Sequence, residues 1–402
     1  MLSYRRGGFA RVGIIRLGDA SSPFGPLQEL PFDRETGTLS LGGNPEFAQT
    51  SVRLHFTSMS TPAVLYSHSV ADGTDTVLKR QPVLGSVDLD AYTETLLWAK
   101  AGDGTDIPIS VVFRKDLHQS DEHDGHGGHG GHGEDDGHGD PASPEDAADG
   151  VGADEANGSA ASAKPLLLYG YGSYEASMDP YFSVSRLSLL DRGVVFAIAH
   201  VRGGGEMGRH WYDQGKTTAK KNTFTDFIDV ARHLIDTGWT SPDRLVASGG
   251  SAGGLLMGAI ANMAPELFAG ISADVPFVDA LTSILMPELP LTVIEWEEWG
   301  DPLHDPQVYE YMRSYSPYEN VTEAAYPQIL AVTSLNDTRV LYVEPAKWVA
   351  RLREVGANAL LKTEMVAGHG GASGRYDAWR EIAFEYAWIL DVLGRSDVET
   401  EA

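Results

Sequence analysis

Gly249-Gly250-Ser251-Ala252-Gly253-Gly254 is the most informative stretch of this sequence. It follows an apolar run typical of a buried strand (residues 245–248) and precedes one typical of a helix (residues 255–263). A G-x-S-x-G motif between a strand and a helix predicts a nucleophile elbow, a sharp turn that exposes the serine hydroxyl at the carboxyl end of a sheet. We therefore expect Ser251 to be a nucleophile and the N–H of Ala252 to be an oxyanion donor. The alternative is a glycine-rich turn with a solvated serine.

Strands and helices alternate on both sides of this motif, from residue 165 to residue 393. Short apolar runs predict buried strands, and runs with helical spacing predict helices. This alternation predicts an α/β fold with a doubly wound, mostly parallel sheet. The expected strands are residues 166–170, 194–201, 245–248, 270–273, 328–333 and 359–365, and the expected helices are residues 182–190, 223–237, 255–263, 345–355 and 376–393.

The first part of the chain has a different pattern, in which short β-type runs are separated by turn residues. These runs are residues 12–15, 52–57 and 63–68, followed by a hairpin turn at Asp72-Gly73. Two more runs, residues 95–100 and 107–114, are joined by a turn at Asp103-Gly104. The first three form a β-meander, as in a propeller blade of roughly 40–50 residues. We expect residues 1–84 to be a partial β-propeller and residues 85–402 to be one α/β domain, interrupted by an insert.

The insert, residues 118–163, is rich in histidine, acid and glycine. Residues 119–163 contain 12 acids and 11 glycines but no Lys or Arg, and so cannot bury enough apolar surface to fold. We expect a disordered, solvated linker. The alternative is weak binding of Zn, Ni or Cu by closely spaced imidazoles, although we expect no metal or other cofactor in the function. These histidines are His118, His123, His126, His129, His132 and His138.

The composition excludes several classes of function. The 402 residues include 30 Lys and Arg against 57 Asp and Glu, a formal charge of −27, which argues against nucleic acid as the main partner. The chain has no cysteine, which excludes disulfides, thiolate metal sites and a cysteine nucleophile. The acids are spread through every segment, as in a protein adapted to high salt; a merely acidic protein is the alternative.

No stretch predicts a membrane anchor or an export signal. The longest apolar runs, such as residues 194–199, are far short of the ~18 residues that span a bilayer. The first residues, Met1-Leu-Ser-Tyr-Arg-Arg6, resemble a twin-arginine signal, but Arg11 and Arg16 interrupt the apolar region that such a signal needs. We expect a cytoplasmic protein without a membrane partner.

A nucleophilic serine needs a base and a group that orients the base, and with this elbow the chain order is Ser, then Asp or Glu, then His. Only His304 and His369 follow Ser251. His369 lies in a glycine-rich loop after the last expected strand, whereas His304 lies in a polar segment that is typical of the surface. Asp337 follows the expected strand at residues 328–333. The pattern predicts a triad of Ser251, Asp337 and His369.

Together with the Ser251 motif, seven further segments resemble the prolyl oligopeptidase family of serine peptidases, and most closely its oligopeptidase B branch. They are Tyr169-Gly-Tyr-Gly-Ser-Tyr174, His200-Val-Arg-Gly-Gly-Gly-Glu206, Val275-Pro-Phe-Val-Asp279, Glu295-Trp-Glu-Glu-Trp-Gly300, Tyr315-Ser-Pro-Tyr318, Glu344-Pro-Ala-Lys-Trp348 and Gly368-His-Gly-Gly371. The resemblance implies an α/β-hydrolase fold and a peptidase with Ser251 as nucleophile, His369 as base and Asp337 as its orienting acid.

The resemblance also implies roles for residues around the serine. Tyr171 would be the second oxyanion donor beside Ala252, the alternative being a packed aromatic at a strand end. Arg202 and the three glycines after it match no phosphate-binding loop, and the family implies a structural turn there.

Glu295 and Glu297 are the candidate specificity residues. In an extended segment, residues two apart face the same side, so both carboxylates would converge on one cation. Arg accepts such a pair through two hydrogen bonds. In oligopeptidase B the corresponding pair forms the pocket for Arg or Lys before the cleaved bond; surface acids are the alternative.

Two further residues bear on substrate binding. Asp179 matches one of two acids that read a second basic residue in oligopeptidase B, but Tyr181 stands at the other position. Arg339 follows Asp337 as in prolyl oligopeptidases, where it binds a substrate carbonyl.

The expected function is therefore hydrolysis of oligopeptides after Arg or Lys. Alternatives on the same scaffold are prolyl-, acylaminoacyl- or dipeptidyl-type peptidases and an esterase. Family members carry a full propeller that restricts entry, of which this sequence holds only the last portion. There are three alternatives. The entrance is unrestricted and larger substrates enter; a separate propeller-bearing chain or self-association completes the propeller; or the chain is a truncated product. The alternative that is not an enzyme is a catalytically silent fragment that pairs with a separate propeller-bearing chain.

The acidic composition generates a first prediction. We expect the melting temperature to rise between low and molar NaCl, because screening reduces repulsion among the excess carboxylates. Thermal unfolding followed by circular dichroism across a salt series measures this. A melting temperature indifferent to molar salt would contradict the high-salt interpretation.

Overall fold

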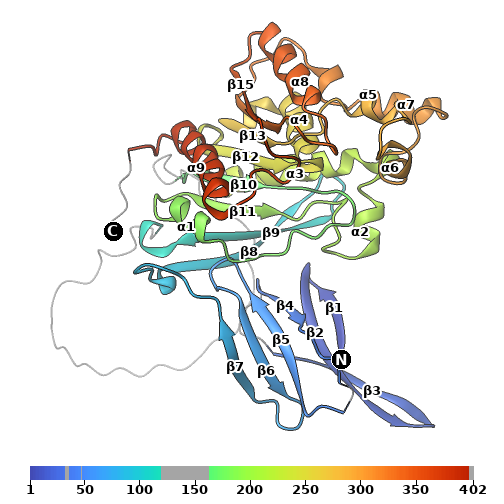
Figure 1. Cartoon of the computed structure of the whole chain (residues 1–402), viewed down its shortest axis with the longest axis vertical. Helices are drawn as coiled ribbons and strands as arrows, with labels where there is room; N and C mark the ends of the chain where they lie inside the picture. The colour runs from blue at the N-terminus through green and yellow to red at the C-terminus, as the bar shows by residue number, and fades with distance from the viewer. Residues whose placement is uncertain (32–35, 47, 119–162, 398–402) are drawn as a thin grey trace, which may run out of the picture.

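The computed structural model describes residues 1–31, 36–46, 48–118 and 163–397. Its centre is an eight-stranded sheet with the order β15-β14-β13-β12-β10-β11-β9-β8 (Figure 1). The strands from β15 to β11 are parallel, and β9 and β8 join antiparallel at one edge. Their bounds are β8 Tyr92–Lys100, β9 Asp106–Arg114, β10 Leu166–Tyr169, β11 Val195–Ala199, β12 Leu245–Gly250, β13 Gly270–Asp274, β14 Gln328–Ser334 and β15 Ala359–Glu364. The predicted doubly wound, mostly parallel sheet is confirmed.

Helices cover both faces of this sheet, and alternate residues of each strand point to opposite faces. Leu166 and Leu168 pack in the larger core with α3 (Lys221–Asp236), α4 (Ala252–Met263) and α8 (Val343–Glu354). Leu167, between them, packs in the second core with α1 (Val184–Leu190) and α9 (Arg375–Val392). Burial of successive residues on both faces explains why these strands are continuous apolar runs.

The sequence order of the strands reverses beside β10. The chain passes from β10 to β11 on one side and then returns to β12 on the other side of β10. In open α/β sheets, ligands bind outside the carboxyl ends of the strands at such a switch point. Ser251 follows β12 directly and Tyr171 follows β10 by two residues, so both lie at this point.

The first strands form two smaller antiparallel sheets beneath the α/β layers (Figure 1). Their shared core contains Val12 and Leu54, which are buried. The expected β-meander is present, with Asp72 and Gly73 in the turn between the last two strands. One sheet consists of β1 (Leu2–Arg6), β2 (Phe9–Asp19) and β3 (Ser22–Glu29), and the other of β4 (Thr38–Leu41), β5 (Ser51–Thr57), β6 (Val64–Ser69) and β7 (Asp75–Arg80).

The expected helices are present, but the sequence patterns missed several short ones. These are α2 (Arg209–Asp213), α5 (Ala280–Ile284), α6 (Thr292–Trp299) and α7 (Pro306–Arg313). Each has at most eight residues, too few to show a clear helical period. None of the described helices is both long and apolar enough to cross a bilayer.

The predicted insert lies outside the described residues except at its two ends. His118, its first residue, packs its ring edge-on against Phe113, with 5.3 Å between ring centroids. Burial lowers the pKa of His118 to about 4, and the charges of Lys164 and Arg395 add to this effect. His118 therefore belongs to the folded hairpin and not to a linker.

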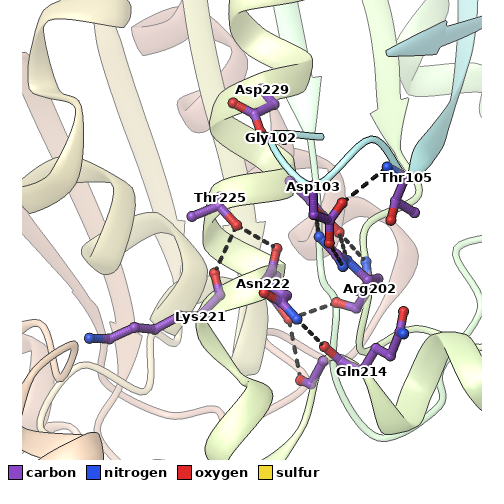
Figure 2. Close-up of polar contacts among 12 residues, drawn as sticks. Gly102, Asp103, Thr105, Arg202, Gln214, Lys221, Asn222, Thr225 and Asp229 are labelled. Carbon is purple, nitrogen blue, oxygen red and sulfur yellow. Dashed lines mark hydrogen bonds and ion pairs between the residues drawn. The ribbon is translucent and has the colours of Figure 1, made fainter. Parts of the chain in front are cut away.

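Arg202 joins the β8–β9 hairpin to α3. Its side chain is almost fully buried and donates to Asp226 at 2.8 and 2.6 Å and to Asp103 at 2.6 Å. Figure 2 shows Arg202 directed at Asp103 in the hairpin turn. The following Gly203 has φ +97, and a Cβ there would lie 2.0 Å from the carbonyl oxygen of Gly172. The expected structural turn is confirmed.

This network generates a prediction for stability. Arg202→Met leaves the carboxylate of Asp226 buried without its cation, so we expect the free energy of unfolding to fall by about 3–5 kcal/mol. Asp103→Asn is the control: the Asp103 side chain is 51% exposed, and its loss should cost less than about 1 kcal/mol. Guanidinium denaturation measures both. Equal midpoints for Arg202→Met and the wild type would contradict the assignment.

Candidate active site

Ser251 lies in a strained turn between β12 and α4. Its φ of 56° and ψ of −115° are unfavourable for a residue with a side chain, and its N–H donates to the carbonyl of Asp274 at 2.8 Å. The chain segments around it approach very closely. A Cβ on Gly249 would lie 2.6 Å from the Gly253 oxygen, and one on Gly253 would lie 2.7 Å from the Gly170 oxygen. The predicted elbow is present, and its glycines are needed for this close approach.

The structure brings His369 and Asp337 to Ser251. His369 Nε2 lies 3.1 Å from Ser251 Oγ, and His369 Nδ1 lies 2.7 Å from Asp337 Oδ2. The other Asp337 oxygen accepts the N–H groups of Arg339 at 2.8 Å and Val340 at 3.0 Å. Because the Asp337 side chain is fully buried and held by these bonds, it can keep the proton on Nδ1 and leave Nε2 free to accept one from serine.

A short, closed loop carries His369. Gly368 and Gly371 pair across it, and the N–H of Gly371 donates to the Gly368 oxygen at 3.1 Å. The next N–H, of Ala372, donates to Glu381 on α9 at 2.9 Å. His304, in contrast, is exposed and contacts Asp301, as predicted for a surface residue.

Two hydrogen-bond donors lie beside the serine hydroxyl. Ala252 is the first residue of α4, where the backbone N–H groups have no acceptor within the helix. Tyr171 lines the same cavity as Ser251. Burial raises the pKa of the Tyr171 phenol, the charge of Glu298 raises it further, and the hydrogen bond with Ser251 opposes the shift. The phenol is therefore neutral at physiological pH and can donate a hydrogen bond to an oxyanion.

The cavity at Ser251 has a volume of about 350 Å³. Its wall combines aromatic rings, one carboxylate and one guanidinium. The lining residues are Tyr171, Tyr174, Ser251, Ala252, Phe277, Leu291, Glu295, Arg339, Val340 and His369.

The expectation for Glu295 and Glu297 is wrong in its geometry. Both belong to helix α6 and not to an extended segment, and residues two apart on a helix point to different sides. Glu295 lines the cavity, whereas Glu297 is exposed and does not. Burial raises the pKa of Glu295; hydrogen bonds from Trp299 and Tyr174 oppose the shift and the charge of Glu298 adds to it.

Glu298 is one of two buried charged residues near the cavity that the sequence pattern missed. It is buried behind the cavity and accepts the Tyr174 N–H at 3.1 Å and the Tyr212 hydroxyl at 2.7 Å. Lys220, also missed, lies 3.8 Å away. A helical interpretation of residues 292–299 would have placed Glu295 and Glu298, three apart, on one face.

Of the two other predicted substrate-binding residues, Arg339 lies at the cavity and Asp179 does not. Asp179 forms a two-bond ion pair with Arg5 of β1, at 2.8 Å for each bond, and does not line the cavity. Its predicted contact with substrate is therefore not supported by its position. Arg339 does line the cavity, and within the described residues no side chain hydrogen-bonds to its guanidinium. No group of three His, Asp or Glu residues in the described ranges is placed to hold a metal ion.

Comparisons with known proteins find peptidases that resemble most of this chain. Residues 180–396 match the prolyl oligopeptidase family model. Dipeptidyl aminopeptidase BI of Pseudoxanthomonas mexicana is 45% identical over 366 residues, which are 90% of this chain and 45% of that protein. Protease 2 of Moraxella lacunata is 41% identical over 397 residues, covering 98% of this chain and 50% of that protein.

A solved structure agrees with this result. Oligopeptidase B from Leishmania major matches with a TM-score of 0.82 and 38% identity, over 98% of this chain and 50% of that chain. The chain thus spans about half the length of the curated relatives it matches.

Proposed function

Because the chain belongs to the prolyl oligopeptidase family, with an α/β-hydrolase domain, we propose that it is a serine peptidase that acts through Ser251, His369 and Asp337. The observation that carries the proposal is the continuous line from the serine hydroxyl through the imidazole to the buried carboxylate, with contacts of 3.1 and 2.7 Å. The chain order Ser, Asp, His is that of α/β-hydrolases.

The reaction follows from this geometry. Ser251 Oγ attacks the peptide carbonyl as His369 Nε2 takes its proton, and the Asp337 carboxylate stabilises the imidazolium. The carbonyl oxygen becomes an oxyanion that accepts hydrogen bonds from Ala252 N–H and the Tyr171 hydroxyl. His369 then gives its proton to the leaving amine. Water, activated by the same imidazole, hydrolyses the acyl-enzyme and frees Ser251.

Glu295 supports a preference for Arg or Lys before the cleaved bond. It is the carboxylate that lines the cavity, and the rings of Tyr174 and Phe277 beside it can pack against the side-chain stem. Arg339, at the same cavity, can donate to a substrate carbonyl. We propose that one basic residue is read here and that Asp179, paired with Arg5, reads none.

A second candidate function is removal of dipeptides from a free amino terminus. Its support is the 45% identity to a protein named dipeptidyl aminopeptidase BI. We further propose that the enzyme works on peptides in a cytoplasm of high salt, because the acid excess of −27 suits screening by salt.

The triad generates a prediction for activity. In high salt, the protein should hydrolyse a fluorogenic Arg substrate faster than a Pro substrate or a simple ester. Ser251→Ala should abolish turnover, and Asp337→Asn should lower kcat by roughly ten-thousand-fold because the imidazole then holds the wrong tautomer. Substrates with free and blocked amino termini separate the two candidate functions. Ester hydrolysis with fluorophosphonate labelling but no peptide turnover would favour an esterase, and no labelling would favour a silent fragment.

The corrected geometry of α6 generates a prediction for specificity. Glu295→Gln should lower kcat/KM for the Arg substrate by about 10–100-fold, mainly through KM, because a charged hydrogen bond to the guanidinium is lost. Glu297→Gln, on the same helix but exposed, is the matched control and should change nothing. Steady-state kinetics on Arg and neutral substrates measure the difference. An equal loss in both variants would restore the two-carboxylate pocket.

A further inference from the structure

Lys220 is a fully buried lysine next to the candidate active site. Its ammonium donates to the Gly172 carbonyl and to the Ser173 hydroxyl, both at 2.6 Å, and lies 3.8 Å from Glu298 Oε1. Lysine is almost never fully buried unless it is paired, because taking an ammonium out of water is costly. The reaction described above does not use this charge.

Glu298 holds the next residue of the same loop. Its Oε1 accepts the Tyr174 N–H at 3.1 Å, and its Oε2 accepts the hydroxyl of Tyr212 on α2 at 2.7 Å. Lys220 and Glu298 therefore contact three consecutive residues, 172 to 174. One approaches from the start of α3 and the other from α6.

This loop needs external support. Tyr174 and Glu175 have φ values of 60° and 57°, a region that residues with side chains rarely occupy, and Gly172 before them has φ 72°. A strained backbone persists only where its surroundings determine it. The same loop carries Tyr171 and Tyr174, both of which line the cavity at Ser251.

We propose that Lys220 and Glu298 are positioning residues, which hold the 170–175 loop so that the Tyr171 hydroxyl meets the oxyanion and Tyr174 forms the pocket wall. The proposal rests on the peptidase function proposed above. The ion pair serves catalysis through the loop, beyond its contribution to folding. Removing it should affect kcat more than KM, because the oxyanion contact forms only in the transition state.

The surroundings of Lys220 make its charge sensitive to pH. Burial lowers its pKa to about 8, and the charge of Glu298 opposes this shift. Lys220 faces the Trp299 ring at 5.0 Å, and Lys216 approaches the Tyr212 hydroxyl at 3.4 Å. As the pH rises through about 8, Lys220 loses its proton and the ion pair is lost, so kcat should fall on the alkaline side.

The test compares Lys220→Met, Glu298→Gln and the double variant Lys220→Met/Glu298→Gln, with Lys221→Met as control. Lys221 is the adjacent lysine, and its side chain stacks on Tyr311, away from the loop. Melting temperature, fluorophosphonate titration of Ser251, and kcat and KM for the fluorogenic Arg substrate are measured from pH 6 to 10. The double variant leaves no buried charge unpaired, and its Gln amide can still accept from the Tyr174 N–H and donate to the Tyr212 hydroxyl oxygen, so it separates folding from positioning.

We expect Lys220→Met to lower kcat per titrated site by about 100-fold, as for a displaced catalytic group, and Lys221→Met to leave it unchanged. The double variant should regain the wild-type melting temperature but not the wild-type kcat. Glu298→Gln should move the alkaline limb to lower pH, since Glu298 no longer raises the pKa of Lys220. A folded double variant with wild-type kcat would overturn the positioning role alone. A wild-type protein without Ser251-dependent turnover would overturn the proposed function as well.

Discussion

The active site depends on the turn at Ser251, which no ordinary backbone conformation would produce. The Ser251 N–H donates to the Asp274 carbonyl, the Ser251 carbonyl accepts the N–H of Phe277, and the backbone contacts are too close for any Cβ at Gly249 or Gly253. These contacts fix β12, α4 and the strand end at Gly170 relative to one another. The strain is tolerable because the core around β12 is apolar and closely packed on both faces.

Parallel strand order then explains how distant residues meet. Ser251, Asp337 and His369 each follow a different strand of one parallel sheet, and such strands end at the same edge. The separation of 118 positions between Ser251 and His369 therefore costs the site little, because the sheet has already brought their strand ends together. Asp337 adds precision, since two backbone N–H groups fix one of its oxygens while the other meets the imidazole.

The sequence predicted the strands, the long helices and the meeting of Ser251, Asp337 and His369 because each depends on local signals: apolar runs, a glycine-rich motif and chain order. It failed where tertiary contacts decide. Helix α6 has eight residues and no side-chain cap, so its own sequence signals a helix only weakly, and the acids at 295 and 297 suggested an extended segment. In the structure its helical form accompanies the burial of Trp299 and Glu298. Lys220 gave no signal, since an isolated lysine is typical of the surface. The pairing of Asp179 with Arg5 joins residues 174 positions apart and has no local trace at all.

The charges around the cavity bear on which substrate side chain it can bind. Lys220 offsets the charge of Glu298 behind the cavity wall, whereas Glu295 forms no ion pair with any residue that the structure describes. Arg339 is exposed to water, which screens its charge far more than the half-buried wall screens that of Glu295. An incoming cation could pair with this carboxylate. The preference for a basic side chain that we propose would then depend on the internal pair as well as on Glu295, because without Lys220 the two carboxylates would repel each other without a cation nearby and the pKa of Glu295 would rise further.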